Sequence, residues 1–149
     1  MAVRLTIMII CLTVLGTAGC THVGVALPPE RRVINELSKL RYPGGGELGD
    51  DLDIIVVRDG PVITLTNRTA EAYQDHYLWL NRQYVAPVKL IRIGTDNRLE
   101  LPKFINHHGE PFPVGAWLTP NKARRIAHAV LYNPDTKQRR RLVVRFADN

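Results

Sequence analysis

The chain has 149 residues, of which 45% are apolar and 23% are charged, and its formal net charge at pH 7 is +6. This length suits one compact domain, and the composition excludes a collagen, a long coiled coil and a highly charged disordered chain. The one continuous apolar run lies at the N-terminus, which excludes a protein with several membrane-spanning helices.

The first twenty residues have the layout of an export signal. Arg4 supplies a positive charge ahead of an apolar run over residues 5–15, and small residues follow, ending in Ala18-Gly19-Cys20. An eleven-residue helix rises about 16 Å, roughly half of the ~30 Å hydrocarbon core of a bilayer. The run is therefore too short for a permanent span and is predicted to be a signal peptide that is removed.

The residues Ala18-Gly19-Cys20 resemble the lipobox of bacterial lipoproteins, although Thr17 stands where a leucine or a similar aliphatic residue is usual. The resemblance covers residues 1–20 only. It implies a signal peptide of residues 1–19 and a diacylglycerol on the Cys20 thiol. The exported domain would then be anchored to a membrane of the bacterial cell envelope, facing the periplasm or the exterior. Two or three acyl chains anchor stably, whereas one chain binds only marginally. An ordinary cleaved signal and an uncleaved anchor are the alternatives.

The chain contains two cysteines, Cys11 and Cys20. Cys11 would leave with the signal and Cys20 would be acylated, so the mature domain has no thiol for a disulfide, a zinc site or a nucleophile. Its 130 residues, which are the 149 of the chain less the 19 of the signal, must be stabilised by their core alone. A domain of this size buries roughly two-thirds of its unfolded surface, which is sufficient.

Residues 20–51 are predicted to be a tether that contains one short amphipathic helix. Apolar side chains recur at helical spacing over residues 30–40, and Pro29 suits the first helical turn. These apolar side chains are Val33, Ile34, Leu37 and Leu40.

From Leu52 onwards the period of the apolar residues changes to two, which predicts seven or eight short strands over residues 52–149. The expected strands are 54–57, 62–66, 77–81, 89–93, 99–101, 115–118 (a weaker candidate), 126–132 and 140–146. Turns separate them, among them Asp59-Gly60 and Asn133-Pro134-Asp135, and no helices lie between them. This pattern predicts a mainly β fold, an antiparallel β-sandwich nearest to the immunoglobulin-like group, with a partly open barrel as the alternative.

Residues with the chemistry of catalysis or metal binding are sparse. His107-His108 lie in a polar stretch with Gly and Pro, and we expect a solvated turn because no spacing brings three ligands together. The carboxylates of residues 50–53 supply charge without the facing geometry of a catalytic pair. Ser38, the only serine, lies in the predicted helix without a nucleophile motif. We therefore expect no enzymatic activity, no metal and no cofactor.

A basic C-terminal segment is the first candidate binding surface. Residues 121–149 hold eight basic and two acidic side chains, a net charge of +6 that includes Arg139, Arg140 and Arg141. The expected partners of such a surface on an exported protein are lipid phosphates, anionic envelope polymers or an acidic protein face. The alternative is that these arginines are solvated turn residues that protect an edge strand from pairing.

An aromatic strand face is the second candidate binding surface. Tyr77 and Trp79 share one face of a predicted strand, and Leu78 and Leu80 share the other. If the leucines face the core, the aromatic face is either covered, most simply by the loop 112–117, or free to bind a sugar or a protein.

These features predict a membrane-anchored envelope lipoprotein that acts as a non-catalytic structural or interaction module. Its expected partners are the membrane, through acylated Cys20, and an envelope protein or an anionic envelope polymer, but not nucleic acid. The alternative is a carbohydrate- or small-ligand-binding module that uses the aromatic face.

Overall fold

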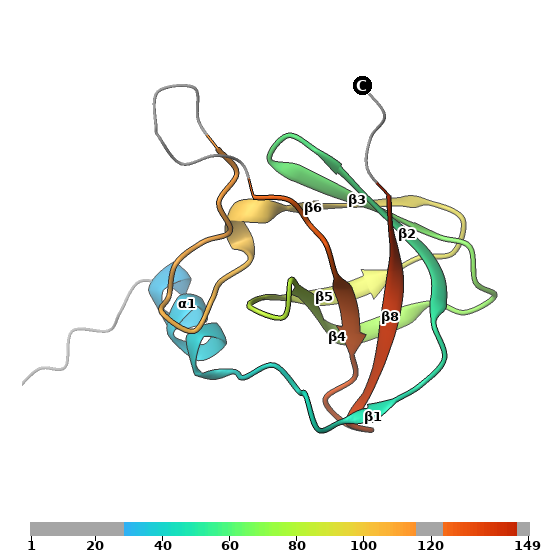
Figure 1. Cartoon of the computed structure of the whole chain (residues 1–149), viewed down its shortest axis with the longest axis horizontal. Helices are drawn as coiled ribbons and strands as arrows, with labels where there is room; N and C mark the ends of the chain where they lie inside the picture. The colour runs from blue at the N-terminus through green and yellow to red at the C-terminus, as the bar shows by residue number, and fades with distance from the viewer. Residues whose placement is uncertain (1–28, 116–123, 146–149) are drawn as a thin grey trace, which may run out of the picture.

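The computed structural model describes residues 29–115 and 124–145 (Figure 1). The expected signal peptide, Cys20, most of the candidate strand 115–118 and Phe146 lie outside this range. The elements in chain order are α1 (Pro29–Lys39), β1 (Glu47–Leu48), β2 (Leu52–Asp59), β3 (Val62–Asn67), β4 (Tyr73–Leu80), β5 (Tyr84–Ile91), β6 (Asp96–Glu100), the 3-10 helix η1 (Leu101–Lys103), β7 (Ala129–Tyr132) and β8 (Gln138–Arg145).

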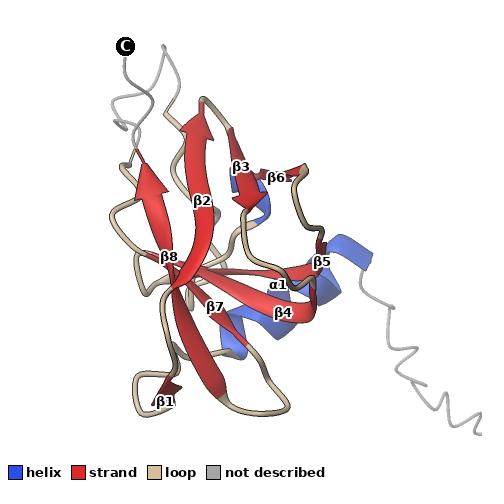
Figure 2. Ribbon diagram, turned by 90° about the vertical axis from the view of Figure 1, so that its right-hand side faces the viewer, coloured by secondary structure: helices blue, strands red, loops and turns tan. Residues whose placement is uncertain are grey.

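The expectation of a mainly β fold with one short helix ahead of it is confirmed. The immunoglobulin-like sandwich is not confirmed. The eight strands of the described residues belong to one sheet, in the order β5-β4-β7-β8-β2-β3-β6 with β1 beside β8. The two end strands of this order, β5 and β6, are consecutive in the chain, so the sheet curls into a nearly closed, barrel-like shape (Figure 2).

The sheet is also mixed rather than antiparallel. β8 runs parallel to β1 and to β2, whereas every other pair of neighbouring strands is antiparallel. The register between β2 and β8 shifts between Leu52 and Ile55, and such an irregularity bends a strand. This parallel pair joins the first and last strands of the predicted strand region, a long-range contact that alternation within each strand does not specify.

The barrel interior holds the main hydrophobic core. Its inward-facing side chains come from all the longer strands and from η1, and the largest fully buried ones include Ile54, Leu65, Leu78 and Phe104. Leu78 and Leu80 are both fully buried in this core, as expected if they face inward.

Strand boundaries differ from the expected ones mainly around β4 and β5. β5 begins at Tyr84, five residues before the expected strand, and includes Pro87. Proline lacks the amide donor of a ladder and is tolerated at a strand that ends a sheet, and β5 is the first strand of the order. Leu101, expected in a short edge strand, instead begins η1 with Pro102 at its second position. Gly115 lies in no strand.

α1 packs against the outer face of the barrel. Leu37 is buried and belongs to a second hydrophobic cluster with Trp79, Val85 and Val130. The C-terminal carbonyls of the helix accept hydrogen bonds from the guanidinium group of Arg41, which ends the helix. The described part of residues 20–51 also contributes a strand to the sheet, because β1 pairs with β8.

Candidate functional site

Among the described residues, Arg58 closes one end of the barrel. It lies near the end of β2, on the same face of the strand as the core residues Ile54 and Val56. Its Nε donates to the Gly60 carbonyl at 2.8 Å and its Nη2 to the Val114 carbonyl at 2.9 Å, while Nη1 donates to the Arg124 carbonyl. The guanidinium also lies 5.8 Å from the ring centroid of Phe112, within cation–π range. Burial lowers the pKa of the Arg58 guanidinium from its usual value by desolvation. The three guanidinium nitrogens of Arg58 therefore join backbone carbonyls from three separate segments of the chain.

Aromatic rings complete the closure of this end. Tyr84 and Phe112 meet edge to face with their centroids 4.9 Å apart, and the Arg124 guanidinium lies 5.5 Å from the Tyr84 ring centroid. Phe112 is 2% exposed and Val114 packs against the same core, so these two residues of the segment expected to cover the aromatic strand face lie against the barrel interior instead.

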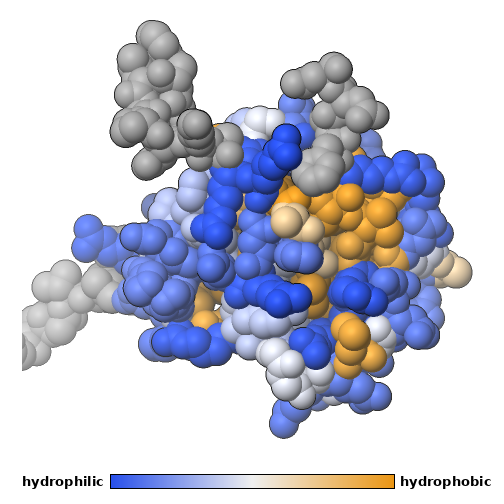
Figure 3. Space-filling model, viewed as in Figure 1, coloured by the Kyte–Doolittle hydropathy of each residue, from blue (hydrophilic) through white to orange (hydrophobic). Residues whose placement is uncertain are grey.

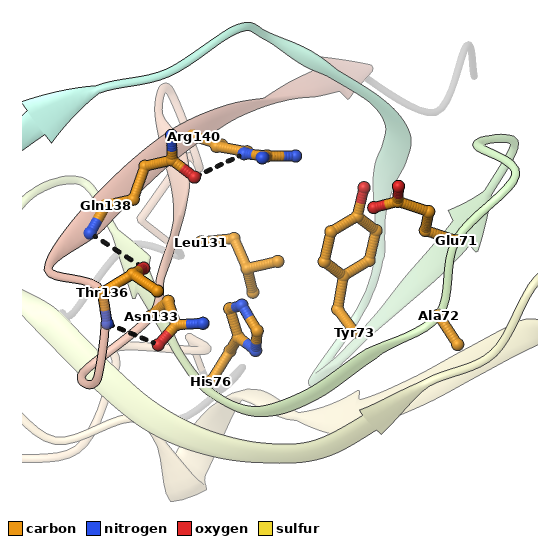
Figure 4. Close-up of a pocket in the computed structure, with 9 residues that line it drawn as sticks. All are labelled: Glu71, Ala72, Tyr73, His76, Leu131, Asn133, Thr136, Gln138 and Arg140. Atoms are coloured by element: carbon orange, nitrogen blue, oxygen red, sulfur yellow. Dashed lines mark hydrogen bonds between the residues drawn. The ribbon is translucent and has the colours of Figure 1, made fainter.

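The opposite end of the barrel contains a hollow of about 300 Å³, shown in Figure 4. Two core residues, Tyr73 and Leu131, form its apolar wall together with Ala72, and polar side chains form the rest. We call this hollow the barrel mouth. Its lining residues are Glu71, Ala72, Tyr73, His76, Leu131, Asn133, Thr136, Gln138 and Arg140.

Arg140 reaches the barrel mouth because of its register in β8. Its partner in the neighbouring strand β7 is Leu131, and it lies on the same face of β8 as Leu142 and Val144, which pack in the core. Its Nε donates to Oε1 of Gln138 at 3.1 Å. Within the described residues its two terminal nitrogens make no hydrogen bond, and Figure 4 shows them pointing across the hollow toward Tyr73.

Two asparagines shape the loops around the barrel mouth. Asn67 is fully buried, donates to the Glu71 carbonyl at 2.7 Å and accepts from the backbone and hydroxyl of Thr69, which fixes the loop before β4. Asn133 accepts from the amides of Asp135 and Thr136 and so closes the expected turn between β7 and β8. Both loops carry side chains that line the hollow.

The histidine of the barrel mouth is oriented by its own strand. Asp75, with φ +52°, lies between Tyr73 and His76, and both of these line the hollow although their spacing is odd. His76 Nδ1 lies 2.5 Å from the Gln74 carbonyl, which can only accept, so Nδ1 is the donor. Nε2 is the ring nitrogen that this hydrogen bond leaves available.

The three adjacent arginines do not form one basic surface. Arg139 and Arg141 lie on the outer face of β8, opposite to Arg140, and pair across β7 with Tyr132 and Val130. Arg139 Nε donates to the Gly46 carbonyl at 2.9 Å, and Arg141 Nε forms an ion pair with Asp51 at 2.7 Å.

The outer arginines line a second hollow of about 320 Å³, which also contains Arg82 and His128. Positive charge is therefore gathered there from two separate parts of the chain.

The aromatic strand face is covered by α1. Tyr77 is half-buried and Trp79 is 4% exposed, and both pack in the cluster that contains Leu37. The Nε1 of Trp79 is buried and has no hydrogen-bond partner among the described residues. The cover predicted from the sequence therefore exists, but the helix provides it, not the described part of the loop 112–117.

Two apolar features mark the outer surface. A groove of about 620 Å³ runs between α1 and the barrel, lined on the helix by Val33, Ile34 and Leu37 and on the barrel by Phe104 and Ile105 among others. Figure 3 shows a separate gathering of apolar side chains over β2 and β8, ringed by hydrophilic ones.

The other polar residues singled out from the sequence are held in local structure. His107 and His108 are exposed, with ring centroids 3.7 Å apart, in a turn that Asn106 closes by accepting from the amides of His108 and Glu110. Ser38 donates to the Asn35 carbonyl within α1. The described residues contain no group of three or more His, Cys, Asp or Glu side chains that could hold a metal ion.

Within residues 29–115 and 124–145, no helix has both the length and the apolar character needed to span a bilayer. No family model, curated protein or solved structure matches the chain.

The barrel mouth as a site was missed in the sequence, although one signal for it was present. Alternation of apolar residues near the C-terminus places 142 and 144 on one face, and extending it by one step toward the N-terminus puts Arg140 on that face, apart from Arg139 and Arg141. No comparable signal joins Tyr73 or His76 to Arg140, because their proximity depends on the pairing of β4, β7 and β8.

Proposed function

We propose that this chain is an exported lipoprotein, anchored to an envelope membrane through acylated Cys20, whose barrel is a non-catalytic module that binds a small ligand at its mouth. The observation that carries the proposal is the difference between the two ends of the barrel. Among the described residues, Arg58, Phe112 and Tyr84 close one end, while the other end holds a hollow lined mostly by polar side chains. Small-molecule sites are typically concave and combine apolar walls with a few convergent polar groups.

The distance from anchor to domain supports a position close to the membrane. Eight residues, 21–28, separate Cys20 from Pro29, the first residue of α1. Even fully extended, a segment of this length spans at most about 30 Å. A lipid on Cys20 would therefore keep the barrel near the bilayer surface.

The small-ligand alternative from the sequence is retained here with a different site. A ligand on the Tyr77–Trp79 face would have to displace α1, including the buried Leu37. The barrel mouth is already hollow and needs no such displacement. We therefore place the ligand, whether a sugar or another small molecule, at the mouth.

The hollow beside Arg82, Arg139 and Arg141 supports a second function, contact with an anionic envelope polymer or an acidic protein face. The ion pair of Arg141 with Asp51 is exposed, and exposed pairs contribute little and exchange readily. A polymer with repeated negative charges could compete for these arginines.

Detergent partitioning of a Cys20→Ser variant tests the anchor, with Cys11→Ser as the matched control. We expect Cys20→Ser to move from the detergent phase to the aqueous phase and to lose the mass of the acyl chains. Cys11→Ser should partition like the unaltered chain, because Cys11 belongs to the segment that is removed. Unchanged partitioning and mass for Cys20→Ser would refute the anchor.

A further inference from the structure

From the geometry of Arg140 we infer that the ligand of the barrel mouth is a small acid, whose carboxylate or phosphate oxygens bind the guanidinium of Arg140. The inference rests on the proposed function, since it names the ligand class of the same site. Guanidinium groups bind such oxyanions through two parallel hydrogen bonds, which gives both affinity and orientation.

Arg58 and Arg140 both face inward from their strands but differ in how their donors are used. Every nitrogen of the Arg58 guanidinium donates to a backbone carbonyl. Arg140 uses only Nε, and its terminal nitrogens have no hydrogen-bond partner within the described residues. Arg58 is therefore committed to holding the fold, whereas Arg140 has its paired donors available to a ligand.

The stem of Arg140 is held in place while its terminal donors stay available. Gln138 accepts from Nε at 3.1 Å. The backbone of Gly49 approaches so closely that an added Cβ would lie 2.9 Å from Nε2 of Gln138 and 3.4 Å from Cγ of Arg140. A guanidinium that is already oriented loses less side-chain entropy when an anion binds.

The rest of the barrel mouth suits a small hydroxylated or otherwise polar acid. The Tyr73 and Thr136 hydroxyls and the Asn133 amide line the same hollow and can donate to ligand oxygens, while Nε2 of His76, whose Nδ1 is the donor, can accept from a ligand hydroxyl. The volume of about 300 Å³ lies at the small end of ligand sites. Glu71 lies at the exposed rim of the same hollow and forms no ion pair with Arg140.

Strand alternation supplies a matched control. Arg139 and Arg140 are adjacent in β8, carry the same charge and lie on opposite faces of the sheet. Replacing either with glutamine changes the net charge of the protein equally. Both substitutions would weaken binding that depends on the general positive charge of the protein. Only Arg140→Gln would weaken the binding of an oxyanion at the mouth.

The test is an NMR titration of the full chain, purified in detergent, with inorganic phosphate, succinate and uncharged glucose as separate probes. We expect phosphate or succinate to shift the signals of Tyr73, His76 and Leu131, and the arm that does so identifies the kind of oxyanion. Arg140→Gln should weaken that binding by about tenfold or more, as expected for a lost charge-assisted pair. Arg139→Gln should change it by less than roughly twofold, because Arg139 lies on the opposite face of the sheet from the barrel mouth.

Further variants keep the result interpretable. Arg140→Lys retains the charge without the planar fork and should bind with intermediate affinity, and circular dichroism shows whether each variant is folded. Binding of an acid that is unaffected in folded Arg140→Gln, or weakened equally by Arg139→Gln, would overturn the inference. Shifts at the mouth with glucose alone would overturn the ligand class but support the binding module. A mouth that responds to none of the three probes would overturn both.

Discussion

Tyr42 meets Trp79 edge to face, with ring centroids 5.6 Å apart and ring planes at 85°. Tyr42 lies in the segment that follows α1, and Trp79 lies on the outer face of β4. Tyr42 and Leu37 pack against the Tyr77–Trp79 strand face, which from the sequence could be either covered or free. This contact makes the outer aromatics part of the packing between helix and barrel.

Leu37→Ala should therefore lower the free energy of unfolding by about 3 kcal/mol, the usual cost of truncating a buried leucine. Leu37 is 5% exposed, whereas Val33, one turn earlier in α1, is 52% exposed. Val33→Ala is the matched control and should change the stability by less than about 0.5 kcal/mol. Urea denaturation followed by Trp fluorescence measures both values. Equal effects for the two variants would show that α1 does not pack on the barrel through Leu37.

Arg58→Met should lower the free energy of unfolding by about 2 kcal/mol, because partly buried carbonyls lose a charged donor. The loss should be largest around Val114 and Arg124, whose carbonyls Arg58 joins across the closed end. Hydrogen exchange of residues 112–115 and 124–126 reports this local loosening. Arg98→Met, at an exposed position of β6, is the control and should leave these exchange rates unchanged. Unaltered protection in Arg58→Met would mean that the closed end is held by its aromatic rings alone.

Gly49→Ala should disturb the barrel mouth without unfolding the protein. The added Cβ would meet the side chains of Gln138 and Arg140, and these side chains would have to shift to make room for it. We expect weaker acid binding in the titration described above and a change in the Arg140 Nε–H signal. Gly45→Ala is the control, since a Cβ there meets nothing within 4 Å. If Gly49→Ala and Gly45→Ala bind alike, the Gln138–Arg140 pair is not held by that contact.

Local patterns were sufficient for the individual elements. Helical spacing located α1 to within one residue at each end, a β-branched run located the centre of β2, and alternation located β3. The residues Asn133-Pro134-Asp135 located the turn between β7 and β8. The predicted boundaries were wrong where tertiary context outweighed a local rule. Pro87 concealed the start of β5, because its missing amide is tolerated at the end of the sheet order.

The sequence by itself determined which side chains could share a face, because side-chain direction follows from a period of two or 3.6 residues. Only the tertiary structure decided what each face meets. The parallel pairing of β2 with β8 made one curled sheet instead of two layers, and α1 covered Trp79. Pairing of β4, β7 and β8 brought Tyr73, His76 and Arg140 around one hollow. Such contacts join residues far apart in the chain, and no short-range periodicity records them.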